Sequence, residues 1–340
     1  MRQLSGYPFE PWFLQRLQAT TRFCLMTHVG PDADGLGAQL GFARAAELAG
    51  RQVRIVNEDP CPARYSWMDP KGRISDFDHA ADECEKAELG LIFDAHEHDR
   101  AKRPAERFRE LGKPLWVVDH HPSDPTLDLQ GVIAPEFSSS GELVYRLIEA
   151  LGWPIDAEVA APLYAAMSFD TGSFRFLRNQ GDTLRVAAAL LDTGIDTNPI
   201  QEALFASRPR DEVTLLGRAL TRQRFSAGGR IAWAILPQEV GEGLDLANDA
   251  FGELIPTFIG IDGVMIALIA KPGRQPNEWK LSFRSKAAVK IGHVAKGLRG
   301  GGHDHAAGAT VNGDIEVVCA EVVAQLRAAL VDQLGIVADD

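Results

Sequence analysis

The chain is poor in the features that mark secreted and membrane proteins. Its four cysteines are widely scattered and form no C-x-x-C pair, so the sequence carries no disulfide framework. No stretch approaches the roughly 20 apolar residues that span a bilayer. The N-terminal segment also lacks the basic start and long apolar core of a signal peptide. We therefore expect a cytoplasmic protein in a reduced setting, with no membrane partner.

Positive charge is also scarce, with 35 Lys and Arg against 47 Asp and Glu and a formal net charge of −12. A broad grip on long nucleic acid needs many Lys and Arg contacts to phosphates, so we expect no long duplex as a partner. A small anionic substrate stays compatible, because bound metal ions reverse the charge locally. The length of 340 residues and the 45% hydrophobic content are typical of a globular protein with two domains.

The first two-thirds of the chain alternates apolar runs with helical patterns, which is typical of parallel βαβ units. The apolar runs predict strands over residues 23–27, 53–56, 89–93, 115–118 and 132–134. The helical patterns predict helices over residues 35–48, 140–151, 157–167 and 182–191. The predicted fold class is therefore α/β, beginning with a domain built on a parallel sheet.

A polar, proline-punctuated segment then separates this region from a second one. We interpret residues 196–215 as a connector between a first domain over residues 1–195 and a second over residues 216–340. The second region contains predicted strands over residues 231–236, 264–270 and 279–283, a Gly-rich turn over 300–302, and a final helix over 317–334. It is expected to form a smaller α/β domain.

Acidic and imidazole side chains follow the predicted strands where each strand ends. The first strand runs into His28-x-x-x-Asp32-x-Asp34, the third into Asp94, and the fourth into Asp119-His120-His121. Ligands bind at the carboxyl ends of strands in open α/β sheets. Crowded carboxylates repel one another unless a cation neutralises them, so this edge is a candidate metal site.

The histidine pair is expected to divide its roles. Adjacent residues on a strand point to opposite sides, so one of His120 and His121 should bind the metal and the other should face substrate. Asp119 would then orient them from behind. His96 and His98 lie nearby, but we interpret them as surface positions rather than ligands.

Two alternative interpretations concern the first motif. Asp32 and Asp34 are also compatible with an Asp-rich turn that caps the next helix. Behind them, Gly35-x-Gly37-x-x-x-Gly41 resembles a dinucleotide fingerprint, but its spacing is one residue too long for G-x-G-x-x-G. A nicotinamide-dependent oxidoreductase is therefore kept only as a secondary alternative.

Asp170, in the turn Asp170-Thr171-Gly172, joins Asp32, Asp34 and Asp94 as a fourth candidate metal-binding carboxylate. An oxygen-rich set with some imidazole suits Mn²⁺ or Mg²⁺ better than structural Zn²⁺. Two such ions about 3.5–4 Å apart can activate a water and hold a phosphate in line. The residues thus predict metal-assisted phosphoester hydrolysis.

Taken together and in order, these motifs resemble the DHH phosphoesterases. Two further stretches in the second region, Gly300-Gly301-Gly302-His303 and Ser282-Phe283-Arg284-Ser285, look like the DHH-associated domain of that family. Within the family, the chain is most similar to the branch of nano-RNases and pAp phosphatases. Its turn Ser138-Ser139-Ser140-Gly141-Glu142 resembles the Ser/Thr-rich turn into a helix in that branch.

The resemblance implies a role for each motif residue. It implies one Mn²⁺ held by His28, Asp32 and Asp94, and a second held by Asp34, Asp94, His120 and Asp170. Mg²⁺ or Co²⁺ are alternatives to Mn²⁺. His121 would meet the scissile phosphate, with Asp119 supporting the histidine pair. The second domain would bind substrate through Arg284, Ser285, Gly301, Gly302 and His303, across a cleft between the domains.

The activity that the resemblance implies is hydrolysis of short oligonucleotides, including nanoRNA and linear dinucleotides, to mononucleotides. It also implies hydrolysis of 3′-phosphoadenosine 5′-phosphate (pAp) to AMP. The sequence does not determine the oligomeric state, and a homodimer is compatible with it. Within the same family, a cyclic-dinucleotide phosphodiesterase and a RecJ-like single-strand exonuclease are alternatives. A non-catalytic nucleotide-binding regulator is the alternative from another class.

Overall fold

The structure is a computed structural model that describes residues 8–123, 129–178, 180–246, 250–252, 254–273, 275–286 and 288–336. The chain forms two compact units, Met1–Ser207 and Arg208–Asp340. The boundary between them falls inside the segment 196–215 that the sequence analysis interprets as a connector. Each unit has its own sheet and its own hydrophobic cores.

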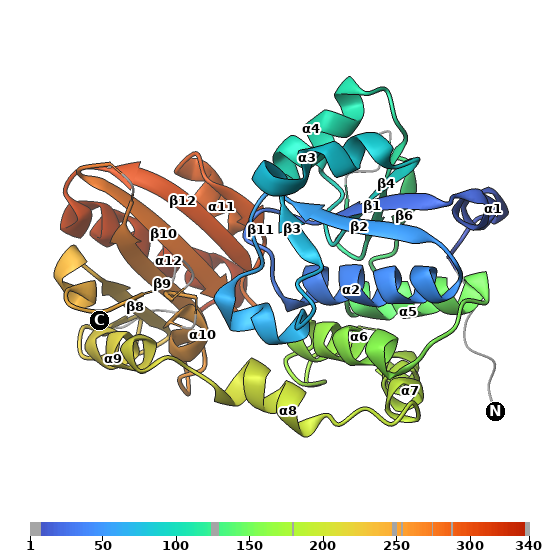
Figure 1. Ribbon diagram of the computed structural model, residues 1–340. Helices are drawn as coiled ribbons and strands as arrows, with labels where there is room; N and C mark the ends of the chain where they lie inside the picture. The colour runs from blue at the N-terminus through green and yellow to red at the C-terminus, as the bar shows by residue number, and fades with distance from the viewer. Residues whose placement is uncertain are drawn as a thin grey trace. The chain divides into compact units, whose positions relative to one another are not determined.

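The first unit is built on a six-stranded parallel sheet with the strand order β3-β2-β1-β4-β5-β6 (Figure 1). The strands are β1 Arg22–Met26, β2 Gln52–Asn57, β3 Ile74–Asp76, β4 Leu89–Phe93, β5 Leu115–Asp119 and β6 Gly131–Ile133. From β1 the chain adds β2 and β3 on one side and then adds β4, β5 and β6 on the other, so the strand order reverses between β1 and β4. In open α/β sheets this switch point is where ligands bind, at the carboxyl ends of the strands.

Both faces of this sheet are apolar. Alternate residues of each strand point to opposite sides, and apolar residues occupy both sets. On β1, Phe23 and Leu25 join one core, whereas Cys24 and Met26 join the other. The first core includes α2 Ala33–Leu48, α5 Ser140–Leu151, α6 Ala157–Asp170 and α7 Gln180–Leu191. The second core is covered by α3 Phe77–Lys86 and α4 Lys102–Glu110. The remaining helical segments of the unit are α1 Pro11–Ala19, α8 Asn198–Gln201, η1 Ala63–Met68, η2 His98–Arg100 and η3 Glu202–Ala206.

The glycines that resemble a dinucleotide fingerprint have a packing role. A Cβ on Gly37 would collide with the backbone oxygen of Pro162, and one on Gly41 would lie 2.5 Å from the side chain of Leu163. Both partners belong to α6, so the glycines let α2 and α6 approach closely. This glycine stripe of α2, formed by Gly37 and Gly41, therefore packs against α6.

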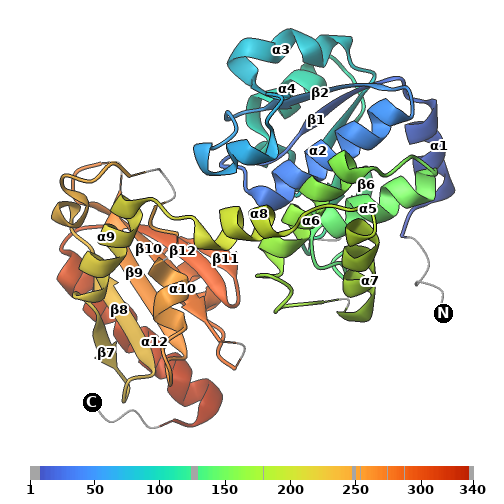
Figure 2. The same cartoon turned by 60° about the horizontal axis from the view of Figure 1, so that its bottom comes forward.

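The second unit contains a six-stranded mixed sheet with the order β11-β12-β10-β9-β8-β7 (Figure 2). Its strands are β7 Arg224–Ser226, β8 Ile231–Ile235, β9 Ile266–Pro272, β10 Glu278–Ser285, β11 Gly301–His303 and β12 Ala306–Asn312. Within the described part of this second sheet, only β8 and β9 pair in parallel. Its helical segments are α9 Arg210–Leu220, η4 Gln238–Gly241, α10 Leu254–Ile259, α11 Gly292–Gly297 and α12 Ile315–Leu334. Each face of this sheet has its own hydrophobic core. Helices α11 and α12 pack on one face, and α9 and α10 pack on the other.

The predicted fold class, a parallel-sheet domain followed by a smaller α/β domain, is confirmed. The stretch predicted as a Gly-rich turn differs, because Gly301 and Gly302 pair with Gly308 and Ala307 as an edge strand. The helices α3 and α4 were not predicted, since their charged sequences bury few apolar residues. Among the described residues, no helix is both long enough and apolar enough to span a membrane.

Candidate active site

The first motif begins where β1 ends. Thr27 fixes this point, since its hydroxyl donates to the Phe93 carbonyl of β4 at 2.8 Å. Asp32 then caps α2, accepting hydrogen bonds on Oδ1 from the backbone amides of Asp34 and Gly35. Its other oxygen, Oδ2, lies 3.9 Å from His28 Nε2. The capping role considered for Asp32 is therefore real, and it leaves one carboxylate oxygen directed at the candidate site.

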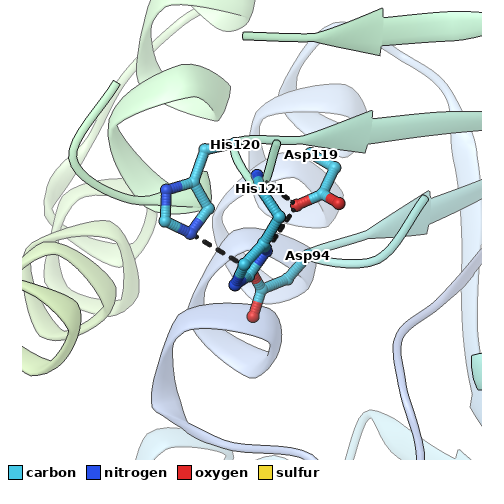
Figure 3. A group of neighbouring side chains, drawn as sticks. All are labelled: Asp94, Asp119, His120 and His121. Atoms are coloured by element: carbon cyan, nitrogen blue, oxygen red, sulfur yellow. Dashed lines mark hydrogen bonds and ion pairs between the residues drawn. The ribbon is translucent and has the colours of Figure 1, made fainter. Parts of the chain in front are cut away.

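Asp94 occupies the centre of the cluster, one residue beyond β4 (Figure 3). Its backbone adopts φ +60°, a left-handed conformation that aspartate tolerates better than most residues. The side chain is 3% exposed, and its Oδ1 accepts a 3.0 Å hydrogen bond from the Ser140 hydroxyl. Asp94 Oδ1 lies 3.5 Å from His120 Nε2, and Asp94 Oδ2 lies 3.5 Å from His28 Nε2. Asp94 Oδ1 also lies 3.5 Å from His121 Nδ1, so one carboxylate faces three histidines.

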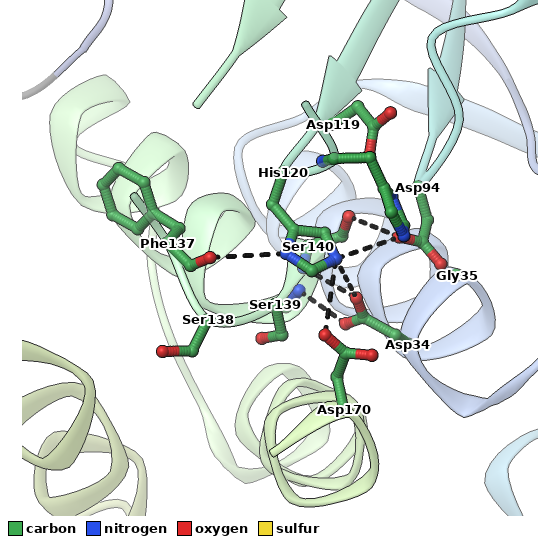
Figure 4. Close-up of polar contacts among 12 residues, drawn as sticks. Asp34, Gly35, Asp94, Asp119, His120, Phe137, Ser138, Ser139, Ser140 and Asp170 are labelled. Atoms are coloured by element: carbon green, nitrogen blue, oxygen red, sulfur yellow. Dashed lines mark hydrogen bonds and ion pairs between the residues drawn. The ribbon is translucent and has the colours of Figure 1, made fainter. Parts of the chain in front are cut away.

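The carboxylate of Asp34 is held by the first turn of α5 (Figure 4). The backbone amides of Ser140 and Gly141 donate to its two oxygens at 2.7 and 2.9 Å. The first amides of a helix have no partner within the helix and attract negative charge. Ser139 caps the same helix by accepting from the Glu142 amide. This arrangement keeps Asp34 fixed although it is buried.

His120 lies where three carboxylates converge (Figure 4). Its Nδ1 lies 3.3 Å from the Phe137 carbonyl, which favours a proton on Nδ1 and a lone pair on Nε2. That Nε2 is 3.4 Å from Asp170 Oδ2, 3.5 Å from Asp94 Oδ1 and 3.6 Å from Asp34 Oδ2. It is buried and has no hydrogen-bond partner. A buried acceptor surrounded only by acceptors calls for a cation.

The side chain of His28 has the same arrangement. Its Nδ1 lies 3.0 Å from the Val29 carbonyl, so Nε2 presents its lone pair to Asp32 and Asp94. Three residue groups among the described residues each have ligand atoms within 4.8 Å of one another: Asp94, Asp119, His120 and His121; His28, Asp32 and Asp94; and Asp34, His120 and Asp170. The first of these overlaps the other two through Asp94 and His120. The other two groups coincide with the two sets that the family resemblance implies, except that the third group does not include Asp94.

The electrostatics of the cluster also fit divalent cations. Burial and the neighbouring Asp94 raise the pKa of Asp34 well above its usual range and raise that of Asp32 to about 6. Burial likewise raises the pKa of Asp170. At Asp94, burial alone would raise the pKa, but the imidazoles of His120 and His28, each 3.5 Å away, outweigh it and lower the pKa. Without a cation the crowded carboxylates resist ionisation, so the donor set is suited to hold positive charge.

Asp119 and His121 lie beside this cluster at the end of β5. Asp119 Oδ1 accepts from both the backbone amide and Nδ1 of His121, at 3.0 and 2.8 Å. This hydrogen bond raises the pKa of His121 and, outweighing burial, lowers that of Asp119. Of the adjacent histidines, His121 is the one whose Nδ1 is held by Asp119, whereas Nδ1 of His120 faces the Phe137 carbonyl.

The interpretation of His96 as a surface position is wrong. Its Nδ1 lies 2.7 Å from Oδ2 of the fully buried Asp119, and its side chain is 15% exposed. The neighbouring His98 is half-buried, and its Nε2 has no hydrogen-bond partner. Residue spacing gave no signal for His96, because its contact depends on the conformation of the loop after β4.

Two further contacts were also missed. A Ser cap at the start of the helix over 140–151 follows from the sequence, but nothing in the sequence indicates that the amides of Ser140 and Gly141 bind Asp34. Arg178 donates through Nη1 to the His120 carbonyl at 3.0 Å. No pattern in the sequence pointed to Arg178.

The residues predicted to bind substrate lie in the second unit. Arg284 and Ser285 end β10, where the Ser285 hydroxyl donates to the Val289 carbonyl at 2.5 Å. Gly302 has φ +121°, and a Cβ there would lie 2.5 Å from the Ala306 oxygen, so the fold requires glycine. A Cβ on Gly301 would meet nothing within 4 Å. The side chain of His303 lies outside the described part of the structure.

Comparison with known proteins identifies relatives over most of the chain. The model of the DHH family, N-terminal domain, matches residues 22–167, and that of the DHHA1 domain matches residues 232–334. A bifunctional oligoribonuclease and PAP phosphatase NrnA of Thermus thermophilus is 31% identical over 308 residues, covering 89% of this chain and 88% of the relative. The protein of the same name from Bacillus subtilis is 25% identical, covering 87% and 94%. An exopolyphosphatase-related protein from Bacteroides fragilis shares the fold, with a TM-score of 0.84 and 23% identity over 92% of this chain and 94% of that one.

Proposed function

Because this chain belongs to the DHH family of phosphoesterases, we propose that it hydrolyses very short oligonucleotides to mononucleotides and pAp to AMP, using two divalent metal ions. The hydrolysis of phosphoester bonds follows from family membership. The substrates and the number of ions are the finer part of the proposal, and each has its own support below.

The observation that carries the proposal is the environment of His120 Nε2. It is buried, has no hydrogen-bond partner, and faces oxygens of Asp34, Asp94 and Asp170 at 3.4–3.6 Å. Oxygen and imidazole ligands that lie about 2.1 Å from an octahedral ion are separated from one another by about 3 Å. These four residues would therefore hold a divalent cation after a small inward movement of their side chains.

The chain offers ligands for a pair of ions. His28, Asp32 and Asp94 would hold one, and Asp34, His120 and Asp170 the other, with Asp94 between them. When bound, such ions supply a polarised water and stabilise charge on the phosphate. The oxygen-rich donor set favours Mn²⁺ or Mg²⁺, and we propose Mn²⁺.

Other residues of the chain would contact and orient the substrate. His121 has Nδ1 held by Asp119, and this hydrogen bond raises its pKa, so the doubly protonated ring would donate through Nε2 to a phosphate oxygen. In the second unit, Arg284, Ser285, Gly301, Gly302 and His303 would bind the substrate's phosphate and nucleotide. The segment from Arg284 to Arg299 contains five basic residues and no acidic one, which favours a short anion despite the net charge of −12.

The substrate proposal draws on the relatives that carry the name bifunctional oligoribonuclease and PAP phosphatase. The acidic composition supports a short substrate, because only a local basic surface is needed to bind it. A long RNA would instead meet many unfavourable acidic residues. Di- to pentanucleotides are therefore expected to be cleaved faster than longer RNA.

The test is turnover of a substrate panel by the purified full-length chain with Mn²⁺, Mg²⁺ or Co²⁺. The panel holds a linear dinucleotide, a pentanucleotide, a 24-nucleotide RNA, pAp and a cyclic dinucleotide. We expect Mn²⁺-dependent hydrolysis of the first two and of pAp, and little of the others. Preferred cleavage of the cyclic dinucleotide or the 24-mer would overturn the substrate assignment.

A matched variant tests the metals. Asp94→Asn keeps the size of the side chain and tolerates the left-handed backbone, but it removes the central charge. We expect Mn²⁺ binding, measured by calorimetry, and hydrolysis to be lost together. Full Mn²⁺-dependent activity in this variant would refute the two-metal proposal.

A further inference from the structure

Asp119 is held between two histidines from different parts of the chain. His121 Nδ1 lies 2.8 Å from Oδ1, and His96 Nδ1 lies 2.7 Å from Oδ2. Asp119 itself is completely buried at the end of β5. Each carboxylate oxygen therefore has its own imidazole partner.

The chemistry of these groups fixes the direction of both hydrogen bonds. An ionised carboxylate only accepts, so both histidines must carry a proton on Nδ1. His121 then keeps Nε2 directed away from Asp119. The contact from His96 leaves Asp119 no free oxygen with which to turn toward another partner.

The loop that carries His96 is itself anchored. Ala95 and Ala101 on either side of it are buried, and the Arg100 carbonyl accepts from the Val29 amide at 2.8 Å. This hydrogen bond ties the loop after β4 to the segment that contains His28. His96 is thus presented to Asp119 by a fixed piece of backbone.

We propose that His96 is a positioning residue which, by holding Asp119 Oδ2, fixes the orientation and tautomer of His121 for contact with the substrate phosphate. The inference rests on the proposed function of His121 in phosphoester hydrolysis. Without His96, one oxygen of a buried carboxylate loses its partner, and Asp119 can rotate to recover one. His121 would then lose its fixed geometry while the metal ligands stay in place.

The kinetic test compares His96→Ala with His96→Asn, with His98→Ala as the matched control from the same loop. Asn Nδ2 occupies nearly the position of His Nδ1 and can donate to Asp119. We expect His96→Ala to lower kcat roughly 10- to 100-fold with little change in KM or Mn²⁺ affinity. His96→Asn should recover most of kcat, and His98→Ala should resemble the wild type.

A second measurement does not depend on activity. In the metal-free protein labelled with ¹⁵N-histidine, long-range NMR correlations report which ring nitrogen carries the proton. We expect a single Nδ1–H tautomer for His121 in the wild type and in His96→Asn, and a mixture in His96→Ala. Wild-type kcat together with an unchanged His121 tautomer in His96→Ala would overturn the inference. A wild type that cleaves no substrate would overturn the proposed function instead, because the NMR comparison would still test the contact.

Discussion

The backbone amide of Ser140 donates a 2.7 Å hydrogen bond to the carboxylate of Asp34, although 106 positions separate the two residues. Gly141 donates to the other oxygen of the same carboxylate at 2.9 Å. The start of α5 therefore fixes a side chain that follows β1. The candidate site is assembled from the carboxyl ends of β1, β4 and β5, together with the start of α5 and the end of α6.

Asp170→Asn separates metal binding from folding. Burial raises the pKa of Asp170, so the ionised form is unfavourable in the metal-free protein. A neutral side chain of the same size should leave the melting temperature of the metal-free protein unchanged or higher. We expect the increase in melting temperature caused by Mn²⁺ to be largely lost, as measured by calorimetry with and without the ion. A lower metal-free melting temperature with normal Mn²⁺ stabilisation would contradict a ligand role.

Ser140 and Ser139 offer a pair of variants with opposite effects. Ser140→Ala removes the hydroxyl that donates to Asp94 at 3.0 Å but leaves the helix amides in place. Ser139→Ala removes the cap of α5, which accepts from Glu142. We expect Ser139→Ala to cost about 1 kcal/mol of unfolding free energy. Ser140→Ala should destabilise the fold less than Ser139→Ala does, but it should lower the activity more, by roughly 10-fold or above. Denaturant unfolding and steady-state kinetics on both variants check this.

The sequence predicted that the candidate ligands at the strand ends lie together, because their positions follow from topology alone. An apolar run that ends in Asp94 or Asp119 places these residues at the carboxyl edge of a parallel sheet, whatever the loops do. The contact of His96 with Asp119 depends on the path of one loop, and periodicity carries no information about it. The edge strand at Gly301 was missed for a related reason. Its pairing is decided by β12, whereas a glycine run by itself indicates a turn.

Gly301 and Gly302 should respond differently to alanine. Gly302→Ala places a side chain where φ is +121° and the Ala306 oxygen is 2.5 Å away, so the second unit should lose stability. A Cβ on Gly301 meets nothing, so Gly301→Ala should fold normally. If Gly301 lets a phosphate approach the backbone, this variant should raise KM several-fold at unchanged kcat. Thermal unfolding and a KM measurement on both variants distinguish the roles, and an unchanged KM in Gly301→Ala would exclude that approach.

Gly37 tests whether the glycine stripe of α2 serves packing or nucleotide binding. A Cβ at this position would collide with the Pro162 carbonyl of α6, and the helices cannot separate without disturbing the core. We expect Gly37→Ala to lower the free energy of unfolding by about 1–3 kcal/mol. The matched control is Gly217→Ala in α9, where a Cβ meets nothing within 4 Å and the change should stabilise by about 0.5–1 kcal/mol. Urea unfolding of both variants measures the contrast. A stable Gly37→Ala that bound NADH less tightly than the wild type would instead revive the dinucleotide interpretation.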